Sequence, residues 1–339
     1  MESRSSTSLV SSLLLSLLLV LPSLPSLTLS ASSFRCNTHD YNTLLGIKKA
    51  LNNPYDIIAW LPNVDCCDWP GITCDENTNR VTQFDISHSN LSAEIPPAVG
   101  NLTYLQYLTF HKNPGLHGSI PSTITKLVHL KFLRFSWDGL SGPIPEFLGQ
   151  LKNLEYLNLD FNQFSGSIPD SLGYLPKLSA LFLDRNKLSG PIPYSFGGFK
   201  TSDFYLILSH NQLSGEIPCS LGAVDLTKID LSHNQLVGDA STLFVPNGNL
   251  QTIDLSRNKF DFVLSGVKFP KTLIYLDLSH NHIHGSIPKE IIKLELQTLN
   301  VTYNGLCGRI PYGKNMKRFD YDSFFHNPCL CGKPLPSCK

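Results

Sequence analysis

One segment, L-x-x-L-x-L-x-x-N-x-L, recurs ten times between residues 81 and 306 and constrains the fold more than any other feature. Its Asn position recurs every 23 to 25 residues, at Ser89, Asn113, Asp138, Asn162, Asn186, Asn211, Asn234, Asn258, Asn281 and Asn304. A unit this short cannot bury its own apolar side chains, so it must stack on its neighbours. A length of 339 residues alone would suggest about two globular domains. We predict one elongated array instead.

This period is that of a leucine-rich repeat, and each unit has a physical interpretation. The two Leu of L-x-L point inward from a short strand, and the residue between them points outward. Ten such strands would form one parallel sheet. The Asn turns the chain off the strand, and its amide can pair with backbone groups that would otherwise be buried without partners. The predicted fold class is an α/β solenoid: a curved right-handed leucine-rich repeat superhelix of about ten repeats, with a concave parallel β-sheet and disulfide-stapled N- and C-terminal caps.

The two ends of the chain differ from the array. Residues 1–33 combine Arg4 with a Leu-rich apolar stretch and then small residues, which is typical of a secretory signal peptide. We predict an N-terminal cysteine-paired capping region at 34–80, the repeat array at 81–306 and a C-terminal cysteine-paired cap at 307–339. In the first cap, Asp40 is expected to cap an amphipathic helix whose Leu44 and Ile47 cover the first repeat.

Nine cysteines in a secreted chain indicate disulfides, and eight of them form one cluster in each cap. The neighbouring Cys66 and Cys67 are an improbable pair, because adjacent Cα atoms are closer than a relaxed disulfide allows. The predicted pairs are Cys36–Cys66, Cys67–Cys74, Cys307–Cys329 and Cys331–Cys338. The remaining cysteine, Cys219, is predicted to be a small buried residue.

The charge balance and the missing motifs argue against several classes of function. The 27 basic and 27 acidic residues cancel, so we expect no nucleic-acid binding. No stretch after the signal is long and apolar enough to span a membrane. The sequence has no phosphate loop, zinc signature or nucleophile elbow, and we expect no cofactor and no metal. Sequons for N-glycosylation occur at Asn90, Asn101 and Asn300.

Both flanks of the array carry a more specific pattern. The L-x-G-x-I-P repeat resembles the plant extracellular class of leucine-rich repeats. The segments DCCDWPGITCDENTNRV, NKFDFVLSGVKFPKTL, LNVTYNGLCGRIP and FDYDSFFHNPCLCGKPLPSCK are similar to those of plant polygalacturonase-inhibiting proteins. The resemblance covers residues 36–339. It implies a secreted cell-wall defence protein of the apoplast, not an enzyme, whose concave face binds and inhibits an endopolygalacturonase of a fungus, an insect or a bacterium.

Departures from the repeat consensus indicate where a partner binds. The later repeats keep D-L-S-[HR]-N almost unchanged, and we interpret their Ser and His as exposed surface filling. The first repeats instead place unlike charges beside aromatic residues, which suits a protein-binding face. The predicted partner-binding residues are His111, Arg134, Trp137, Asp160, Phe161, Phe182, Asp184 and Ile207, together with Asp230.

Asp160 and Asp184 occupy the same outward column in adjacent repeats, so their carboxylates should lie roughly 5 Å apart. Such a pair could share a metal, act as acid and base, or await a basic partner side chain. An open sheet without a pocket argues against catalysis. The resemblance implies the third role, in which these carboxylates engage basic residues at the enzyme's cleft, with Asp230 as a further member.

Cationic residues line one rim of the predicted sheet. Lys112, Arg185 and Arg257 are spaced so that a polyanion such as pectin could follow them, while a solvated edge is the simpler interpretation.

Two alternative functions compete with the inhibition of an enzyme by a monomer of this protein. One is a secreted ligand-binding or signalling partner of receptor kinases, and the other is ice binding, which the mixed outward columns disfavour.

Overall fold

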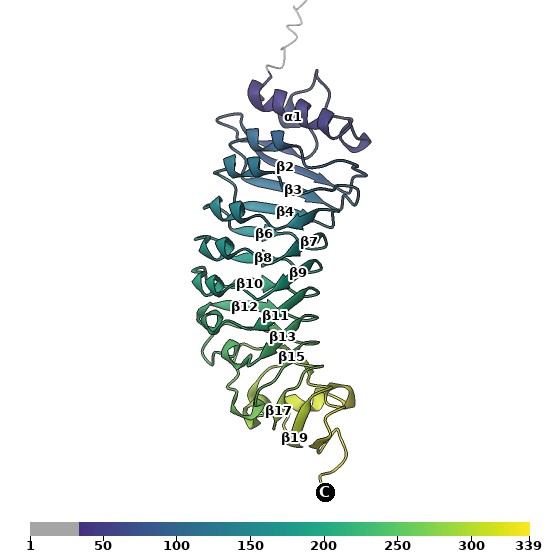
Figure 1. The fold of residues 1–339 in the computed structure, drawn as a ribbon, viewed down its shortest axis with the longest axis vertical. Helices are drawn as coiled ribbons and strands as arrows, with labels where there is room; N and C mark the ends of the chain where they lie inside the picture. The colour runs from purple at the N-terminus through teal and green to yellow at the C-terminus, as the bar shows by residue number, and fades with distance from the viewer. Residues whose placement is uncertain (1–33) are drawn as a thin grey trace, which may run out of the picture. The chain divides into compact units, whose positions relative to one another are not determined.

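Ten parallel strands, one from each repeat, follow one another through the main sheet (Figure 1). The computed structural model describes residues 34–339, and the predicted signal peptide lies outside them. The first strand, β1, adds to the edge in the antiparallel direction. In order, the sheet contains β1 (Ile72–Cys74), β2 (Val81–Ser87), β3 (Tyr107–His111), β4 (Phe132–Ser136), β6 (Tyr156–Asn158), β8 (Ala180–Phe182), β10 (Phe204–Ile207), β12 (Leu226–Asp230), β14 (Thr252–Asp254), β16 (Tyr275–Asp277) and β18 (Thr298–Asn300).

Each strand buries the Leu side chains of the repeat. Leu133, Leu157 and Leu181 are register partners on neighbouring strands and are fully buried. Phe84, Phe110 and Phe135 fill the first repeats in the same way, with ring centroids 5.6 and 5.7 Å apart. The predicted leucine-rich repeat solenoid is confirmed.

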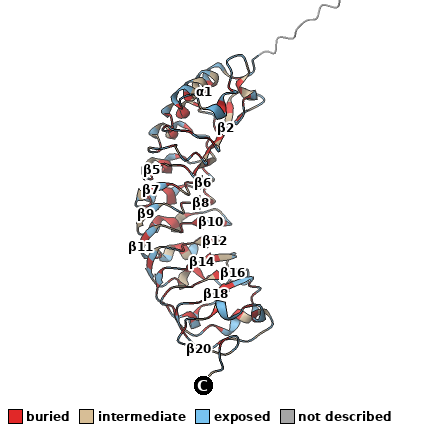
Figure 2. Cartoon of the chain, turned by 90° about the vertical axis from the view of Figure 1, so that its right-hand side faces the viewer, coloured by how far each residue is buried: buried red, intermediate tan, exposed pale blue. Residues whose placement is uncertain are grey.

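A second sheet, which the sequence analysis did not predict, follows the Asn of the middle repeats. It contains β5 (Ser141–Pro143), β7 (Gln163–Gly166), β9 (Lys187–Gly190), β11 (Gln212–Glu216), β13 (Gln235–Gly238) and β15 (Lys259–Phe260). Figure 2 shows β5, β7, β9 and β11 on the side opposite the main sheet, which lines the concave side of the bend. A third sheet near the C-terminus contains β17 (His284–Gly285), β19 (Gly305–Arg309) and β20 (Cys329–Cys331).

Short 3-10 helices complete most turns of the chain. They run over Tyr55–Ile57, Cys66–Asp68, Pro97–Asn101, Ser122–Lys126, Glu146–Gln150, Asp170–Tyr174, Tyr194–Gly198, Cys219–Ala223, Ser241–Leu243, Leu264–Gly266, Lys289–Lys293, Asn315–Arg318 and Tyr321–Ser323. No helix among residues 34–339 is long and apolar enough to cross a membrane.

The Asn side chains form a hydrogen-bonded ladder through the interior. At Asn162 the amide nitrogen donates to the carbonyl of Phe135 in the preceding repeat at 2.7 Å, and the amide oxygen accepts from the backbone of Leu140 at 3.1 Å. Asn327 repeats this pattern inside the C-terminal cap, donating to the Val301 carbonyl and accepting from Leu306. The ladder therefore runs one step further than the ten predicted positions.

The residue before each ladder position adopts a left-handed backbone, from His88 with φ 60° to Tyr303 with φ 53°. This turn takes the chain out of the strand and directs one side chain per repeat along the rim of the sheet. Residues other than glycine rarely adopt this backbone conformation, so the buried ladder must hold it in place. The rim residues are consequently positioned by the fold itself.

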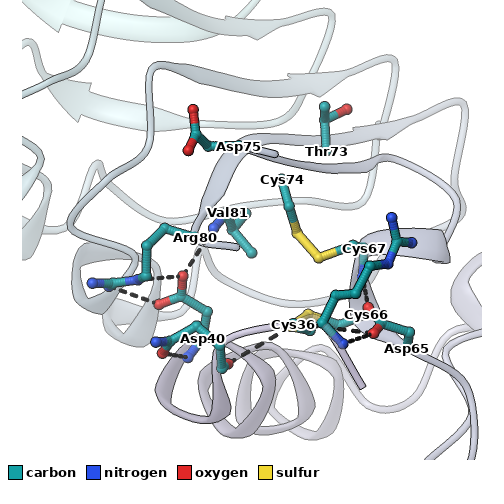
Figure 3. The surroundings of a disulfide bond; sticks show 12 residues. Cys36, Asp40, Asp65, Cys66, Cys67, Thr73, Cys74, Asp75, Arg80 and Val81 are labelled. Atoms are coloured by element: carbon teal, nitrogen blue, oxygen red, sulfur yellow. Dashed lines mark hydrogen bonds and ion pairs between the residues drawn. A yellow bond between two sulfur atoms is a disulfide. The ribbon is translucent and has the colours of Figure 1, made fainter. Parts of the chain in front are cut away.

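The N-terminal cap differs from the prediction at Asp40. Helix α1 (Thr38–Ala50) begins earlier, and Asn37 caps it by accepting from the backbone of His39 at 3.0 Å. Asp40 is fully buried and binds Arg80 with both oxygens, at 2.8 and 2.9 Å, and the Val81 amide (Figure 3). Its role is therefore to join the cap to the first strand of the array and not to cap the helix.

Both caps are closed by disulfides. The bonds join Cys36 to Cys66, Cys67 to Cys74, Cys307 to Cys329 and Cys331 to Cys338. Figure 3 shows the first two close together beside α1, with Asp65 accepting hydrogen bonds from the backbone of Cys36 and Cys67. Cys219 is exposed, so the prediction that it is buried is wrong. It stands at the start of a 3-10 helix, whose first residue faces solvent.

Candidate partner-binding site on the concave sheet

The strand register brings most of the predicted binding residues together. Arg134 lies opposite Asn158, Asn158 opposite Phe182, and Phe182 opposite Ile207 on successive strands. Asp160 and Asp184 follow two residues after Asn158 and Phe182, so they are neighbours at the strand ends. The site is thus a continuous patch over β3, β4, β6, β8 and β10.

His111, Arg134 and Ser136 form a hydrogen-bonded cluster at the N-terminal end of this patch. Arg134 donates through Nη2 to Nε2 of His111 at 3.2 Å and through Nε to the Ser136 hydroxyl at 2.7 Å. His111 Nδ1 lies 2.8 Å from the same hydroxyl. Burial, reinforced by the positive charge of Arg134, lowers the pKa of His111. His111 therefore stays neutral to a lower pH than an ordinary histidine, and its neutral ring can accept from Arg134.

Asp160 and Asp184 are half-buried carboxyl groups with few compensating contacts. Burial raises the pKa of both, and for Asp184 the negative charge of Asp160 adds to this and raises it to about 7. One oxygen of Asp160 accepts from Asn158 at 3.3 Å, while its Oδ1 is buried without a hydrogen-bond partner among the described residues. Removing carboxylates from water without a counter-charge is costly. The pair is consequently poised to accept a cationic group.

Four predicted residues form one stack along the rim. The rings of Trp137 and Phe161 lie face to face with centroids 3.6 Å apart. The Arg185 guanidinium lies 4.9 Å from the centre of the Phe161 ring, and Lys112 Nζ lies 6.0 Å from that of Trp137. Trp137 remains 45% exposed, which leaves it available to a partner. Arg257 lies further along the rim, beyond the stacked rings of His210 and His233.

Several predicted exposures are wrong. Ile207 is only 7% exposed although its column faces outward, and it lies between Phe182 and Asp230 on the adjacent strands. Ser209 and Ser232 of the D-L-S-[HR]-N repeat are also buried. Asp230 is half-buried, and its Oδ1 accepts from both the backbone and the hydroxyl of Ser232, at 3.0 and 2.7 Å. Ile207 is thus not available for contact.

Three aromatic residues at the strand starts, in a row that ends at the predicted Phe182 of β8, were missed. Tyr107, Phe132, Tyr156 and Phe182 follow one another with ring centroids 6.1, 4.3 and 5.2 Å apart. The sequence carries a signal for this row, since an aromatic residue recurs at the same repeat position. Tyr107 and Tyr156 were not among the predicted binding residues, yet Tyr107 is 44% exposed. The row gives the acidic patch an apolar border.

The three sequons lie in different surroundings. Asn90 is exposed, and Asn101 is half-buried at the end of a 3-10 helix. Asn300 lies on β18, where its amide nitrogen donates to Asp277 at 3.1 Å and its oxygen accepts from the Thr302 hydroxyl at 2.8 Å. A glycan at Asn300 would therefore project over the last repeats and not over the patch.

Comparison with known proteins gives the family. The leucine rich repeat N-terminal domain family matches residues 37–75, and the leucine rich repeat family matches 153–175, 177–199, 204–224 and 272–294. The chain is 62% identical to polygalacturonase inhibitor 2 of Arabidopsis thaliana over 315 residues, which cover 92% of this chain and 96% of the relative. It belongs to the polygalacturonase-inhibitor family of leucine-rich repeat proteins. The polygalacturonase inhibitor of Vitis vinifera is 59% identical over 98% of both chains.

The family shares its fold with proteins of other functions. A plant ice-binding protein of known structure is 48% identical and superposes with a TM-score of 0.88, over 90% of this chain and 99% of its own. Membership of the polygalacturonase-inhibitor family and the leucine-rich repeat fold are thus established, while the activity has to be argued from the surface.

Proposed function

We propose that the protein is secreted to the plant cell wall and inhibits endopolygalacturonases of pathogens by covering their cleft with its concave face. The observation that carries this proposal is the pair Asp160 and Asp184, half-buried in the middle of the patch and without an ion pair among residues 34–339. The charges of Arg134 and Arg185 lower the pKa values of Asp160 and Asp184 respectively, but burial outweighs them. A basic side chain of the enzyme that approached them would supply a closer counter-charge than Arg134 and Arg185 do. The names of the relatives support the enzyme class, and the rim stack and aromatic row supply apolar anchors.

The proposed inhibition is reversible and does not involve catalysis. The patch is an open strip on a sheet, and charges on such a surface set partner choice and association rate. We propose that the protein acts as a monomer. Its main partners would be fungal enzymes, with insect and bacterial enzymes as further partners.

An inhibition assay with matched variants tests this function. The purified protein is titrated against a panel of fungal and insect endopolygalacturonases, and Asp184→Ala is compared with Asp277→Ala, an acidic residue in the C-terminal half of the same sheet. We expect Asp184→Ala to weaken inhibition about tenfold or more and Asp277→Ala to leave it nearly unchanged. Equal inhibition by Asp184→Ala and the wild type would remove Asp184 from the site.

Ice binding is a second candidate, because the superposition with the ice-binding protein spans nearly its whole length. The outward columns argue against it, since Arg134, Asn158, Phe182 and Ile207 follow one another where a flat array of one small polar residue would be needed. Thermal hysteresis at micromolar protein concentration would support this candidate, and its absence together with enzyme inhibition would support the first.

Pectin binding along the rim is compatible with inhibition. Lys112, Arg185 and Arg257 are exposed, so their charges are available to a polyanion. We expect Arg257→Glu to weaken retention on immobilised polygalacturonate and added salt to abolish that retention. Retention that is unchanged by this charge reversal would leave the rim as a solvated edge.

A further inference from the structure

Tyr312 stands at the meeting point of three surface hollows in the C-terminal cap. It follows β19, outside the concave sheet, and 66% of its surface is exposed. The hollows measure about 630, 410 and 640 Å³, and Ile310 and Tyr312 line all three. A partner can contact an exposed aromatic side chain from several sides when hollows surround it.

The walls of these hollows are apolar and held in place. The first lies against Ile287, Pro288 and Ile292, and the second against Met316, Phe319, Phe324 and Pro334. The third runs along the segment from Gly332 to Ser337, which the Cys331–Cys338 disulfide closes into a loop. A surface formed before binding saves the partner part of the ordering cost.

The charges around Tyr312 are mostly of one sign. Lys289, Arg309, Lys317 and Lys333 line the hollows, and Glu290 is the one acidic residue among the lining residues. None of the four cations takes part in an ion pair within residues 34–339. Lys317 Nζ lies 5.7 Å from the centre of the Tyr312 ring. In a chain whose 27 basic and 27 acidic residues cancel, this is a local excess of three positive charges.

We propose that this surface, the Tyr312 hub, binds an extended acidic peptide segment of another protein. Side chains alternate along an extended peptide, so apolar residues can enter the hollows while neighbouring carboxylates reach the four cations. Isoleucine and proline walls suit apolar side chains better than the hydroxyl groups of a sugar chain, which would lose water without gaining partners. This binding goes beyond inhibition and is independent of Asp160 and Asp184, because the hub lies outside the concave sheet.

Selection of peptides from a displayed library tests the proposal. Random dodecapeptides are panned against the wild-type protein after subtraction on Tyr312→Ala. We expect the retained peptides to share a pattern of Glu or Asp alternating with apolar residues. The absence of enrichment, or enrichment without acidic residues, would overturn the proposal.

The strongest retained peptide then serves as a fluorescent probe in anisotropy titrations. Tyr312→Ala and Arg309→Glu should each weaken its binding about tenfold or more, as should replacing its carboxylates by amides. Tyr194→Ala, a tyrosine 69% exposed on a 3-10 helix of the array, is the matched control and should bind like the wild type. Asp184→Ala should also bind normally, which separates the hub from the inhibitory face. Unchanged binding by Tyr312→Ala, or displacement of the peptide by oligogalacturonate in place of acidic peptides, would refute the hub.

Discussion

Asp138 leads to the sharpest prediction about stability. It occupies a ladder position where most repeats have Asn, and its Oδ1 accepts from the backbone of Asn113 at 2.8 Å. At the corresponding position Asn162 donates to three backbone carbonyls, whereas Oδ2 of Asp138 is buried without a partner among the described residues. A carboxylate cannot donate, but a protonated carboxylic acid can. We therefore expect Asp138 to be protonated in the folded protein at acidic pH.

The size of the effect follows from the pKa. Burial raises the pKa of Asp138 to about 7, against 3.8 for an exposed aspartate. Because the folded value is the higher one, the folded state holds the proton more tightly, and this stabilisation is complete below about pH 4. It is lost as the pH rises through about 7. Between pH 5 and pH 8 the free energy of unfolding should fall by about 2.5 kcal/mol from this residue alone.

Asp138→Asn should remove this dependence by supplying a permanent donor. Urea unfolding followed by tryptophan fluorescence at pH 5 and pH 8 gives the free energies for both proteins. The free energy of unfolding of Asp138→Asn, relative to that of the wild type, should rise by about 2.5 kcal/mol from pH 5 to pH 8. The reason is that only the wild type loses its donor. The converse change, Asn162→Asp, should introduce the same loss in a second repeat. A difference between wild type and Asp138→Asn that is constant with pH would refute the reasoning.

Three further predictions concern the cap, the rim and the surface. Arg80→Met leaves the buried carboxylate of Asp40 without its cation and should lower the free energy of unfolding by about 3 kcal/mol in urea titrations; a loss below about 1 kcal/mol would contradict the assigned role. Trp137→Ala exposes the face of Phe161 and should weaken enzyme inhibition about tenfold while leaving the urea midpoint within error. In protein secreted from plant cells, peptide mass mapping should find a glycan at the exposed Asn90, and an unmodified peptide would show the sequon to be unused.

The repeat period predicted the fold because each repeated Leu fills the core and each repeated Asn pairs with backbone groups in the ladder. The repeat spacing located the strands and the ladder, and the cysteine clusters located the caps. The second sheet was missed because Gln163–Gly166 and its counterparts lack the alternation of a half-buried strand, and their pairing depends on stacking. Asn327 was missed because no Leu-rich segment precedes it in the usual form, as the sequence there reads FDYDSFFHN.

The candidate site could be predicted only in part. The column of each residue followed from the repeat, but its exposure depends on the side chains around it, and Ile207 and Ser209 are buried although their columns face outward. Asp40 looked like a helix cap because an acidic residue stood before apolar ones. Its partner Arg80 is forty residues away, and such long-range pairing has no local signature.

The central claim is that the first half of the concave sheet binds the enzyme. Hydrogen exchange of the protein alone and in complex with an inhibited endopolygalacturonase tests it most directly. We expect added protection in β3, β4, β6, β8 and β10, with β16 and β18 unchanged. Protection confined to the last repeats or to the second sheet would contradict it.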